Sequence, residues 1–127
     1  MGLSDGKVEA VVAVSDIDKA KEFYEGKLGL SGGKDGDDGG TTYACGGGTS
    51  IHIYPSPDNA GKSGATLAAF VLDDVEGTVD DLAGSGVEFE QYGDPLNTNE
   101  KGIATMEGSS IAWFKDPDGN ILAVGEQ

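Results

Sequence analysis

The residue with the most chemical potential in this sequence is a single histidine. His52 lies in the stretch TSIHIYP (residues 49–55), between two isoleucines, and no other histidine occurs in the 127 residues. An imidazole can bind a metal, move a proton, or fill its hydrogen bonds inside a protein core. Zinc sites need about three or four protein ligands, and non-haem iron sites use two histidines and a carboxylate. The role of His52 therefore depends on the groups that the fold brings to it.

Two further stretches carry reactive or charged side chains. Cys45 is the single cysteine, and with no second histidine to activate it we interpret it as a small buried residue rather than a nucleophile. Residues 34–40, KDGDDGG, are rich in aspartate. If Asp35 were the first ligand of an EF-hand, a glycine would stand where the loop needs its last glutamate. We therefore predict a flexible turn at this segment and no calcium site.

The charge balance excludes several kinds of partner. Acidic residues outnumber basic ones by 23 to 8, the net charge is −15, and every basic residue is a lysine. Such a field repels nucleic acids and anionic membranes, and without arginine there is no planar fork for phosphates or carboxylates. No apolar run approaches the length of a membrane span, the N-terminus does not resemble a signal peptide, and one cysteine allows no internal disulfide. We expect a cytoplasmic protein with neither a nucleic acid nor a membrane as partner.

The first half of the chain predicts a strand, a helix and a hairpin. The stretch 7–14 (KVEAVVAV) is rich in valine and predicts a strand. Ser15 offers an N-cap, and apolar residues then recur at helical spacing until Gly29 ends the helix. A loop with weak strand character leads into two short strands, TTYAC (41–45) and SIHIY (50–54), which are joined by a turn of three glycines.

The second half repeats this order. The expected elements are a strand at 65–72, a helix at 73–84, and strands at 87–92, 102–106, 109–115 and 120–124. The two halves keep one register, because Asp16 and Asp74, which open the two helices, are 58 residues apart, as are the strands before them. We predict one α+β domain over residues 1–127, with two tandem βαβββ modules at about 7–55 and about 65–126 and a linker at 55–64. The order of the hairpins matches SIHIY to NILAV, and therefore His52 to Ala123.

The motifs of the scaffold carry a family resemblance. The strand ending in VSDIDKAKEFYEGKLGL, the repeated unit, the loop-rich second half and the closing WFKDPDGNILAV resemble the vicinal oxygen chelate superfamily, which includes glyoxalase I, extradiol dioxygenases and bleomycin-resistance proteins. The resemblance covers nearly the whole chain, but these motifs do not identify a reaction. It implies paired modules whose curved mixed sheets enclose a cavity, often within a homodimer. In the metal-binding members, four inward side chains, typically His and Glu, chelate one divalent ion; they come from the first and last strands of each module.

Carried over position by position, the resemblance places Glu9 and His52 at the ligand positions of module one. Leu67 and Ala123 occupy the corresponding positions of module two, and neither can bind a metal. Because zinc or nickel needs about three or four protein ligands, this set disfavours a catalytic metal of the superfamily's kind. We expect no cofactor, although Mg²⁺ or Mn²⁺ held by oxygen atoms stays open.

Strand alternation supports an inward position for Glu9 and His52. Glu9, Val11 and Ala13 share one face of their strand, and Ser50, His52 and Tyr54 share one face of theirs. We predict that the fold brings Glu9 and His52 close together, where the carboxylate favours the imidazolium. Such a pair could move a proton on a bound carbonyl compound. The alternative is a pair whose members simply satisfy each other's hydrogen bonds.

Two functions therefore stay open. In the first, the chain binds a small organic molecule in its cavity without a metal, and its negative charge favours a neutral or cationic ligand, drug sequestration being one version. In the second, it is a lyase or isomerase acting on a small carbonyl compound, with Glu9 and His52 as acid and base or as metal ligands. Six further residues are predicted to line the cavity: Tyr43, Ser50, Tyr54, Tyr92, Met106 and Trp113. Tyr54 is the strongest of these, because it lies on the strand face of His52.

Overall fold

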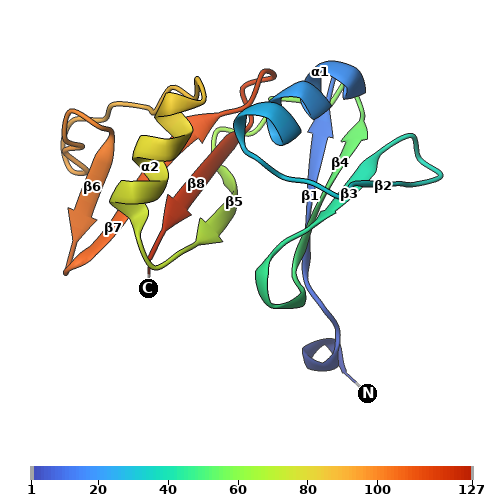
Figure 1. The fold of residues 1–127 in the computed structure, drawn as a ribbon, viewed down its shortest axis with the longest axis horizontal. Helices are drawn as coiled ribbons and strands as arrows, with labels where there is room; N and C mark the ends of the chain where they lie inside the picture. The colour runs from blue at the N-terminus through green and yellow to red at the C-terminus, as the bar shows by residue number, and fades with distance from the viewer. Residues whose placement is uncertain (1, 127) are drawn as a thin grey trace. The chain divides into compact units, whose positions relative to one another are not determined.

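The chain divides after Gly61 into two compact units. The structure is a computed structural model that describes residues 2–126. Each unit contains one helical segment and one sheet of four strands, as Figure 1 shows. Within residues 2–126, no helix has both the length and the apolar character that a membrane crossing requires.

The first unit has the element order β1, α1, β2, β3, β4. A short 3-10 turn, Leu3–Asp5, precedes it, and a π-helical turn, Glu22–Lys27, directly continues α1. The bounds are β1 Glu9–Val14, α1 Ile17–Lys21, β2 Lys34–Asp35, β3 Thr41–Ala44 and β4 Ser50–Pro55, with a 3-10 turn at Gly46–Gly48. The sheet order is β1-β4-β3-β2, with β1 parallel to β4 and the other pairs antiparallel.

The N-cap of the helical segment lies one residue later than predicted. Asp16, not Ser15, is the N-cap, and its carboxylate accepts hydrogen bonds from the backbone N–H groups of Asp18 and Lys19. The segment was predicted as one regular helix, but its second half is a π-helical turn. Gly29 then adopts a φ of 78°, which ends the helix as predicted.

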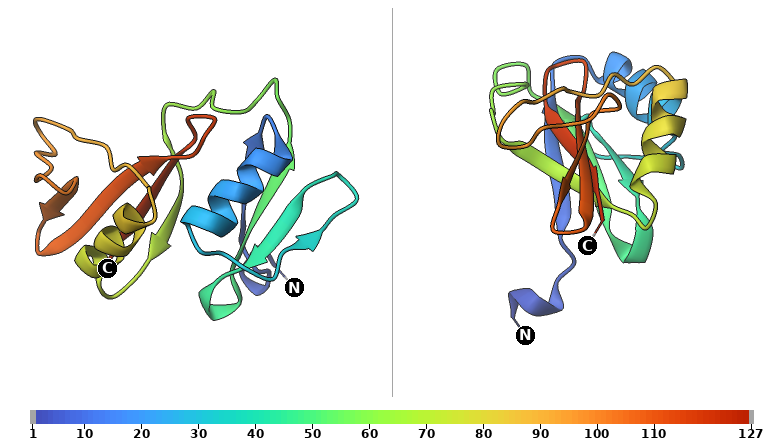
Figure 2. Two further views of the ribbon diagram at one scale, coloured as in Figure 1. Left: turned by 45° about the horizontal axis from the view of Figure 1, so that its top comes forward. Right: turned by 90° about the vertical axis from the view of Figure 1, so that its left-hand side faces the viewer.

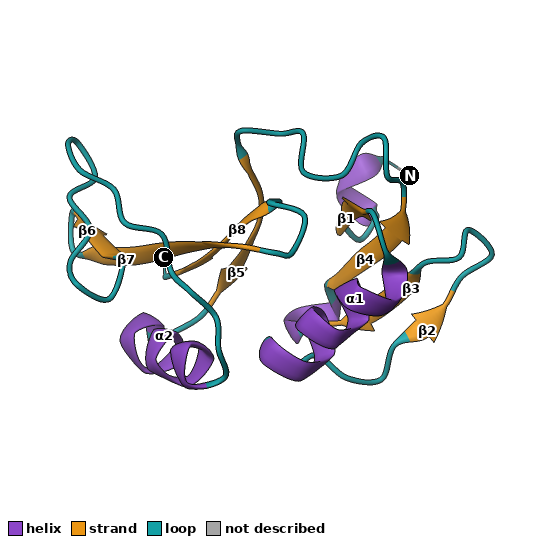
Figure 3. Cartoon of the chain, turned by 90° about the horizontal axis from the view of Figure 1, so that it is seen from above, coloured by secondary structure: helices purple, strands orange, loops and turns teal. Residues whose placement is uncertain are grey.

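The second unit repeats the topology of the first. Its elements are β5 Thr66–Val71, α2 Val75–Gly84, β6 Ile103–Met106, β7 Ser109–Lys115 and β8 Ile121–Gly125. The sheet order is β5-β8-β7-β6, again with the first pair parallel. The predicted α+β fold of two tandem βαβββ modules is confirmed. Each sheet carries its own helix across one face, which Figures 2 and 3 show from different sides.

The prediction of a strand at residues 87–92 is wrong. In this segment only Phe89 forms an isolated bridge, to Phe114, and Glu90 N–H donates one hydrogen bond to the carbonyl of Trp113. The reason is that β6 already occupies the edge of β7 over residues 109–112. Only the last few residues of that edge are free to pair with the Phe89 segment.

Burial separates the two faces of the first sheet. Val12 and Val14 of β1 and Ile51 and Ile53 of β4 are almost fully buried, because they point toward the helical segment. Their neighbours in sequence are half-buried or exposed. This alternation is the pattern predicted from the sequence, with one helix-covered face and one open face.

Candidate binding face around His52

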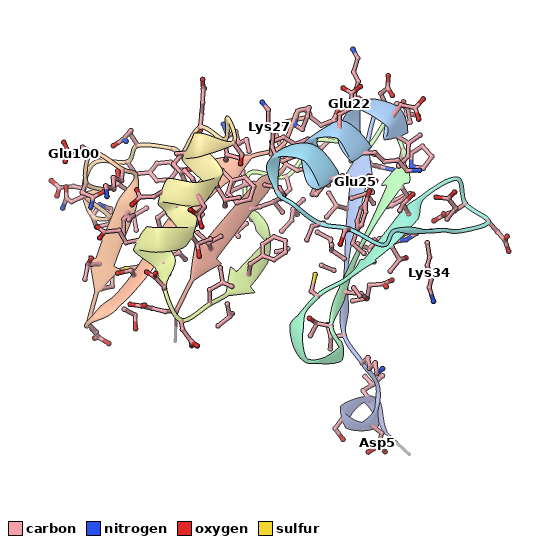
Figure 4. All side chains as sticks on the ribbon, viewed as in Figure 1. Asp5, Glu22, Glu25, Lys27, Lys34 and Glu100 are labelled. Carbon is pink, nitrogen blue, oxygen red and sulfur yellow. The ribbon has the colours of Figure 1, made fainter. Side chains whose placement is uncertain are left out.

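The open face of the first sheet brings the candidate residues together. We use this name for Glu9, Val11 and Ala13 of β1, Thr42 of β3, and Ser50, His52 and Tyr54 of β4. His52 is paired by register with Val11 on one side and with Thr42 on the other, and Thr42 is paired with Lys34 of β2. Directly paired residues point to the same side of a sheet. One row of side chains therefore crosses all four strands, and Figure 4 shows Lys34 extending from β2 at its end.

Both ring nitrogens of His52 are bonded within the unit. Nδ1 lies 2.7 Å from Oγ1 of Thr42, and Nε2 lies 2.7 Å from Oδ2 of Asp38. The imidazole side chain is only 14% exposed. The ring of Tyr54 lies parallel to it at 6.2 Å, with an interplanar angle of 10°. His52 is therefore held by three neighbours from two strands and a turn.

A glycine-rich turn between β2 and β3 delivers Asp38 to the histidine. Gly36 and Gly40 close the turn through a backbone hydrogen bond of 2.9 Å, and Gly39 has a φ of 82°. A Cβ at position 40 would lie 2.9 Å from both Nε2 of His52 and Oδ1 of Asp38, and it would also collide with the carbonyl of Ile53. The glycine at position 40 thus leaves the space in which the carboxylate and the imidazole meet.

The electrostatics of the turn favour an ionised Asp38. The hydrogen bond from His52, followed by the one from the backbone N–H of Gly40, holds the pKa of Asp38 below its ordinary value. Oδ1 accepts the Gly40 bond at 2.8 Å, so both carboxylate oxygens have a donor. The segment predicted as a turn thus contributes a side chain to the site.

The predicted Glu9–His52 pair does not form. Glu9 accepts a hydrogen bond from Oγ of Ser50 at 2.7 Å, and across residues 2–126 no hydrogen bond or ion pair joins it to His52. The register explains this, because Glu9 pairs with Ser50, two residues before the histidine. The face assignment of both residues is nevertheless correct, since each lies on the open side of the sheet.

Tyr43 was predicted to line the cavity but lies on the opposite, helix-covered face. Its side chain is fully buried, and its hydroxyl donates a 2.6 Å hydrogen bond to Glu25 of the π-helical turn, a residue labelled in Figure 4. Burial, and then the bond to Glu25, raise the pKa of Tyr43. Cys45 is also unsuited to chemistry, because burial raises the pKa of its thiol. Both residues are structural.

The second unit places apolar groups at the matching positions. Ala123 is fully buried and is paired by register with Trp113, whose ring contacts Tyr92 edge-on at 5.4 Å. Leu67 lies at a β-bulge and is 39% exposed, and Met106 at the end of β6 is 46% exposed. Trp113 and Tyr92 thus form an aromatic pair.

The residues at the family's ligand positions do not fit a metal ion. Leu67 and Ala123 carry no donor atom, the ring nitrogens of His52 are engaged by Thr42 and Asp38, and Glu9 is bonded to Ser50. Across residues 2–126, no three His, Cys, Asp or Glu side chains come together in a group that could hold an ion. The donor set is that of a hydrogen-bonded cluster and not of a chelate.

Two residues of the site were missed from the sequence, Asp38 and Thr42. Thr42 could have been found by counting, because Ala44 and Ser50 close the glycine hairpin and an antiparallel register then pairs Thr42 with His52. Asp38 had no comparable signal, since its approach depends on the path of the Gly36–Gly40 turn.

The comparisons with known proteins agree with this architecture. A model of the Glyoxalase/Bleomycin resistance protein/Dioxygenase superfamily matches residues 8–124, while no curated protein matches the sequence. A glyoxalase/bleomycin resistance protein from Catenulispora acidiphila is 22% identical, with a TM-score of 0.69 over 95% of this chain and 97% of that one. A superfamily member from Sphaerobacter thermophilus is 23% identical, with a TM-score of 0.71 over 96% and 97%.

A third solved structure is described by what it binds. TnmS3, an antibiotic binding protein from Streptomyces sp. CB03234, is 26% identical, with a TM-score of 0.67 over 95% of this chain and 94% of that one. The family match spans most of the chain. The chain belongs to the glyoxalase/bleomycin resistance protein/dioxygenase superfamily.

Proposed function

We propose that this protein binds a small organic molecule through the open face of the first sheet, without a catalytic metal. The observation that carries the proposal is the composition of that face. Val11 is 57% exposed and is paired by register with the polar His52, beside Ser50, Thr42 and Tyr54. An apolar surface with a few placed polar groups is the usual character of a small-molecule site. The description of TnmS3 as antibiotic binding supports the same function.

Binding accounts for the geometry of His52 better than direct acid–base catalysis. A general base needs a free lone pair within hydrogen-bond reach of the substrate. Both ring nitrogens of His52 already have partners at 2.7 Å. The imidazole can therefore organise the face, but it does not offer a nitrogen to a ligand.

The charge of the chain supports a neutral or cationic ligand. With a net charge of −15 and no arginine, the protein repels anions at long range and attracts cations. Glu9 on the open face, two residues before the exposed Val11, and Asp38, which contacts His52 from the turn, bring carboxylates to this side of the sheet. A cation with an apolar body satisfies both parts of the surface.

The proposal is tested with three phenyl compounds of different charge: benzyltrimethylammonium, benzyl alcohol and benzoate. Binding is measured by NMR titration of the ¹⁵N-labelled chain, and the expected order of affinity is cation, then neutral compound, then anion. Val11→Lys places a cation on the face and should weaken the first compound about tenfold. Val8→Lys is the matched control, because Val8 is an 83% exposed valine just before β1 and its substitution changes the net charge equally.

Two results would contradict the proposal. Equal effects of Val11→Lys and Val8→Lys would show that binding occurs away from the open face. Stoichiometric zinc or nickel, found by elemental analysis of protein purified without chelators, would contradict the metal-free part.

The second candidate is a lyase or isomerase acting on a small carbonyl compound. The chain of hydrogen bonds from Asp38 through His52 to Thr42 favours it, because such a chain can move a proton over a short path. Replacing His52 with Gln should then abolish turnover and leave the circular dichroism spectrum intact. Turnover that survives the substitution refutes this candidate.

The cellular setting is part of the same proposal. We expect the protein to be a cytoplasmic homodimer. Sedimentation velocity measures the state of assembly, and a monomer at micromolar concentration contradicts it.

A further inference from the structure

The direction of the hydrogen bonds around His52 can be derived from its two partners. Asp38 has its pKa below the ordinary value, and an ionised carboxylate can only accept hydrogen bonds. Its Oδ2 lies 2.7 Å from Nε2 of His52. Nε2 must therefore carry a proton and donate it.

This fixes the other end of the ring. A neutral imidazole has one ring proton, so with Nε2 protonated, Nδ1 has only a lone pair. Thr42 Oγ1 lies 2.7 Å from Nδ1 and must be the donor in that bond. The hydroxyl proton of Thr42 is then used inside the sheet, and only oxygen lone pairs remain for a ligand.

The hydroxyl proton of Ser50 is also used in a hydrogen bond within the unit. Its hydroxyl donates to Oε2 of Glu9 at 2.7 Å, so Ser50 also has only lone pairs to offer. The two hydroxyls and the Glu9 carboxylate together present hydrogen-bond acceptors on the open face. Of the side chains on this face, the Tyr54 hydroxyl is a donor that makes no hydrogen bond within residues 2–126.

We infer that Asp38, His52 and Thr42 form a directed hydrogen-bond chain, and that this chain makes Thr42 a specificity-determining acceptor for ligands that carry N–H donors. The inference rests on the proposed function, in which the open face binds the ligand. It adds the hydrogen-bonding class of that ligand: an ammonium or amide N–H is preferred over a group of equal charge and shape that lacks the proton.

The first test needs no ligand. Because His52 is the single histidine, a two-bond ¹H–¹⁵N spectrum of the uniformly labelled full chain reports its tautomer without assignment. In the neutral ring, we expect the Nε2–H tautomer alone. The Nδ1–H tautomer, or a mixture of the two, overturns the inference. Asp38→Ala should produce such a mixture. Thr42→Val shows separately whether the Thr42 hydroxyl contributes to the tautomer preference of His52.

The second test separates hydrogen-bond donation from charge. Benzylammonium and benzyltrimethylammonium carry the same charge, but only the first has N–H donors. Thr42→Val should weaken benzylammonium about tenfold, the size of one hydrogen bond to a charged group, and leave the trimethyl compound unchanged. Thr42→Ser should restore binding. Thr66→Val, at an exposed threonine of β5, is the matched control and should change neither affinity.

The outcomes distinguish this inference from the proposed function. If both cations bind at the open face and Thr42→Val affects them equally or not at all, the inference fails and the proposed function stands. If neither cation binds, both fail.

Discussion

Removing the hydroxyl of Tyr43 tests how the first unit is held together. Tyr43 is fully buried on the helix-covered side of β3, and its hydroxyl donates to Glu25 at 2.6 Å. This hydrogen bond joins the π-helical turn to the sheet. Tyr43→Phe removes it and keeps the ring, so the packing against the sheet should persist.

The expected cost follows from the partners. A hydrogen bond to a charged group contributes about 1.5–3 kcal/mol. Glu25 is exposed, so water can replace the lost donor, and the lower end of this range applies. We therefore expect a loss of about 1.5 kcal/mol in the free energy of unfolding, or a fall in Tm of about 6 °C for a chain of this size.

Urea and thermal unfolding followed by circular dichroism measure the effect. Tyr54→Phe is the matched control, because the Tyr54 hydroxyl makes no hydrogen bond within residues 2–126, and it should change stability by less than about 0.5 kcal/mol. A double-mutant cycle with Glu25→Gln isolates the pair. Equal costs for the two tyrosine substitutions, or simple additivity in the cycle, would refute the reasoning.

The hydrogen bond between Tyr43 and Glu25 also makes stability depend on pH in alkaline solution. Burial and the bond to Glu25 raise the pKa of Tyr43 in the folded state. The unfolded chain then releases this proton first, so the stability contribution is present below about pH 10 and is lost as the pH rises further. The difference in the free energy of unfolding between the wild type and Tyr43→Phe should therefore become smaller above about pH 10.

Three more predictions follow from other features. Gly40→Ala should destabilise the chain and disturb the His52 tautomer, because its Cβ would meet His52 and Asp38; Gly46→Ala, where a Cβ meets nothing within 4 Å, should be nearly neutral in the same urea assay. Raising NaCl from about 0.1 to about 1 M should raise the Tm, because it shortens the screening length from about 10 to about 3 Å around a net charge of −15; a constant or falling Tm would contradict this. Hydrogen bonds from Thr41 and Lys21 lower the pKa of Asp35, and those from His52 and Gly40 lower that of Asp38. The stability from both is present above about pH 4 and lost as the pH falls further, and Asp38→Asn should flatten the acid limb of a Tm–pH curve.

The architecture was predictable because it depends on patterns of residue type and spacing that can be recognised in the sequence. Alternation in β1 and β4, the helical spacing after Asp16 and the offset of 58 residues between the halves are enough to give two βαβββ units. The strand predicted at 87–92 failed for a reason outside its own sequence, namely that β6 already held most of the β7 edge.

The site was predictable only in part. The face of His52 follows from alternation, but its partners depend on register and on turn geometry. In the parallel register of β1 and β4, Glu9 is paired with Ser50, two residues before His52, and it therefore hydrogen-bonds to Ser50. Asp38 reaches the ring because Gly39 takes a positive φ and Gly40 has no Cβ, and neither condition can be read from residue types alone.

The paired register of the two units has a consequence for redesign. In the first unit a small Thr42 faces the ring of His52, whereas in the second the large ring of Trp113 faces the small Ala123. The larger side chain of the pair therefore lies on β4 in the first unit and on β7 in the second, although the two pairs occupy corresponding register positions. An imidazole introduced alone at position 123, which is fully buried, would overpack against the indole. A graft of the histidine chemistry into the second unit must therefore exchange both members of the pair, Ala123→His together with Trp113→Thr.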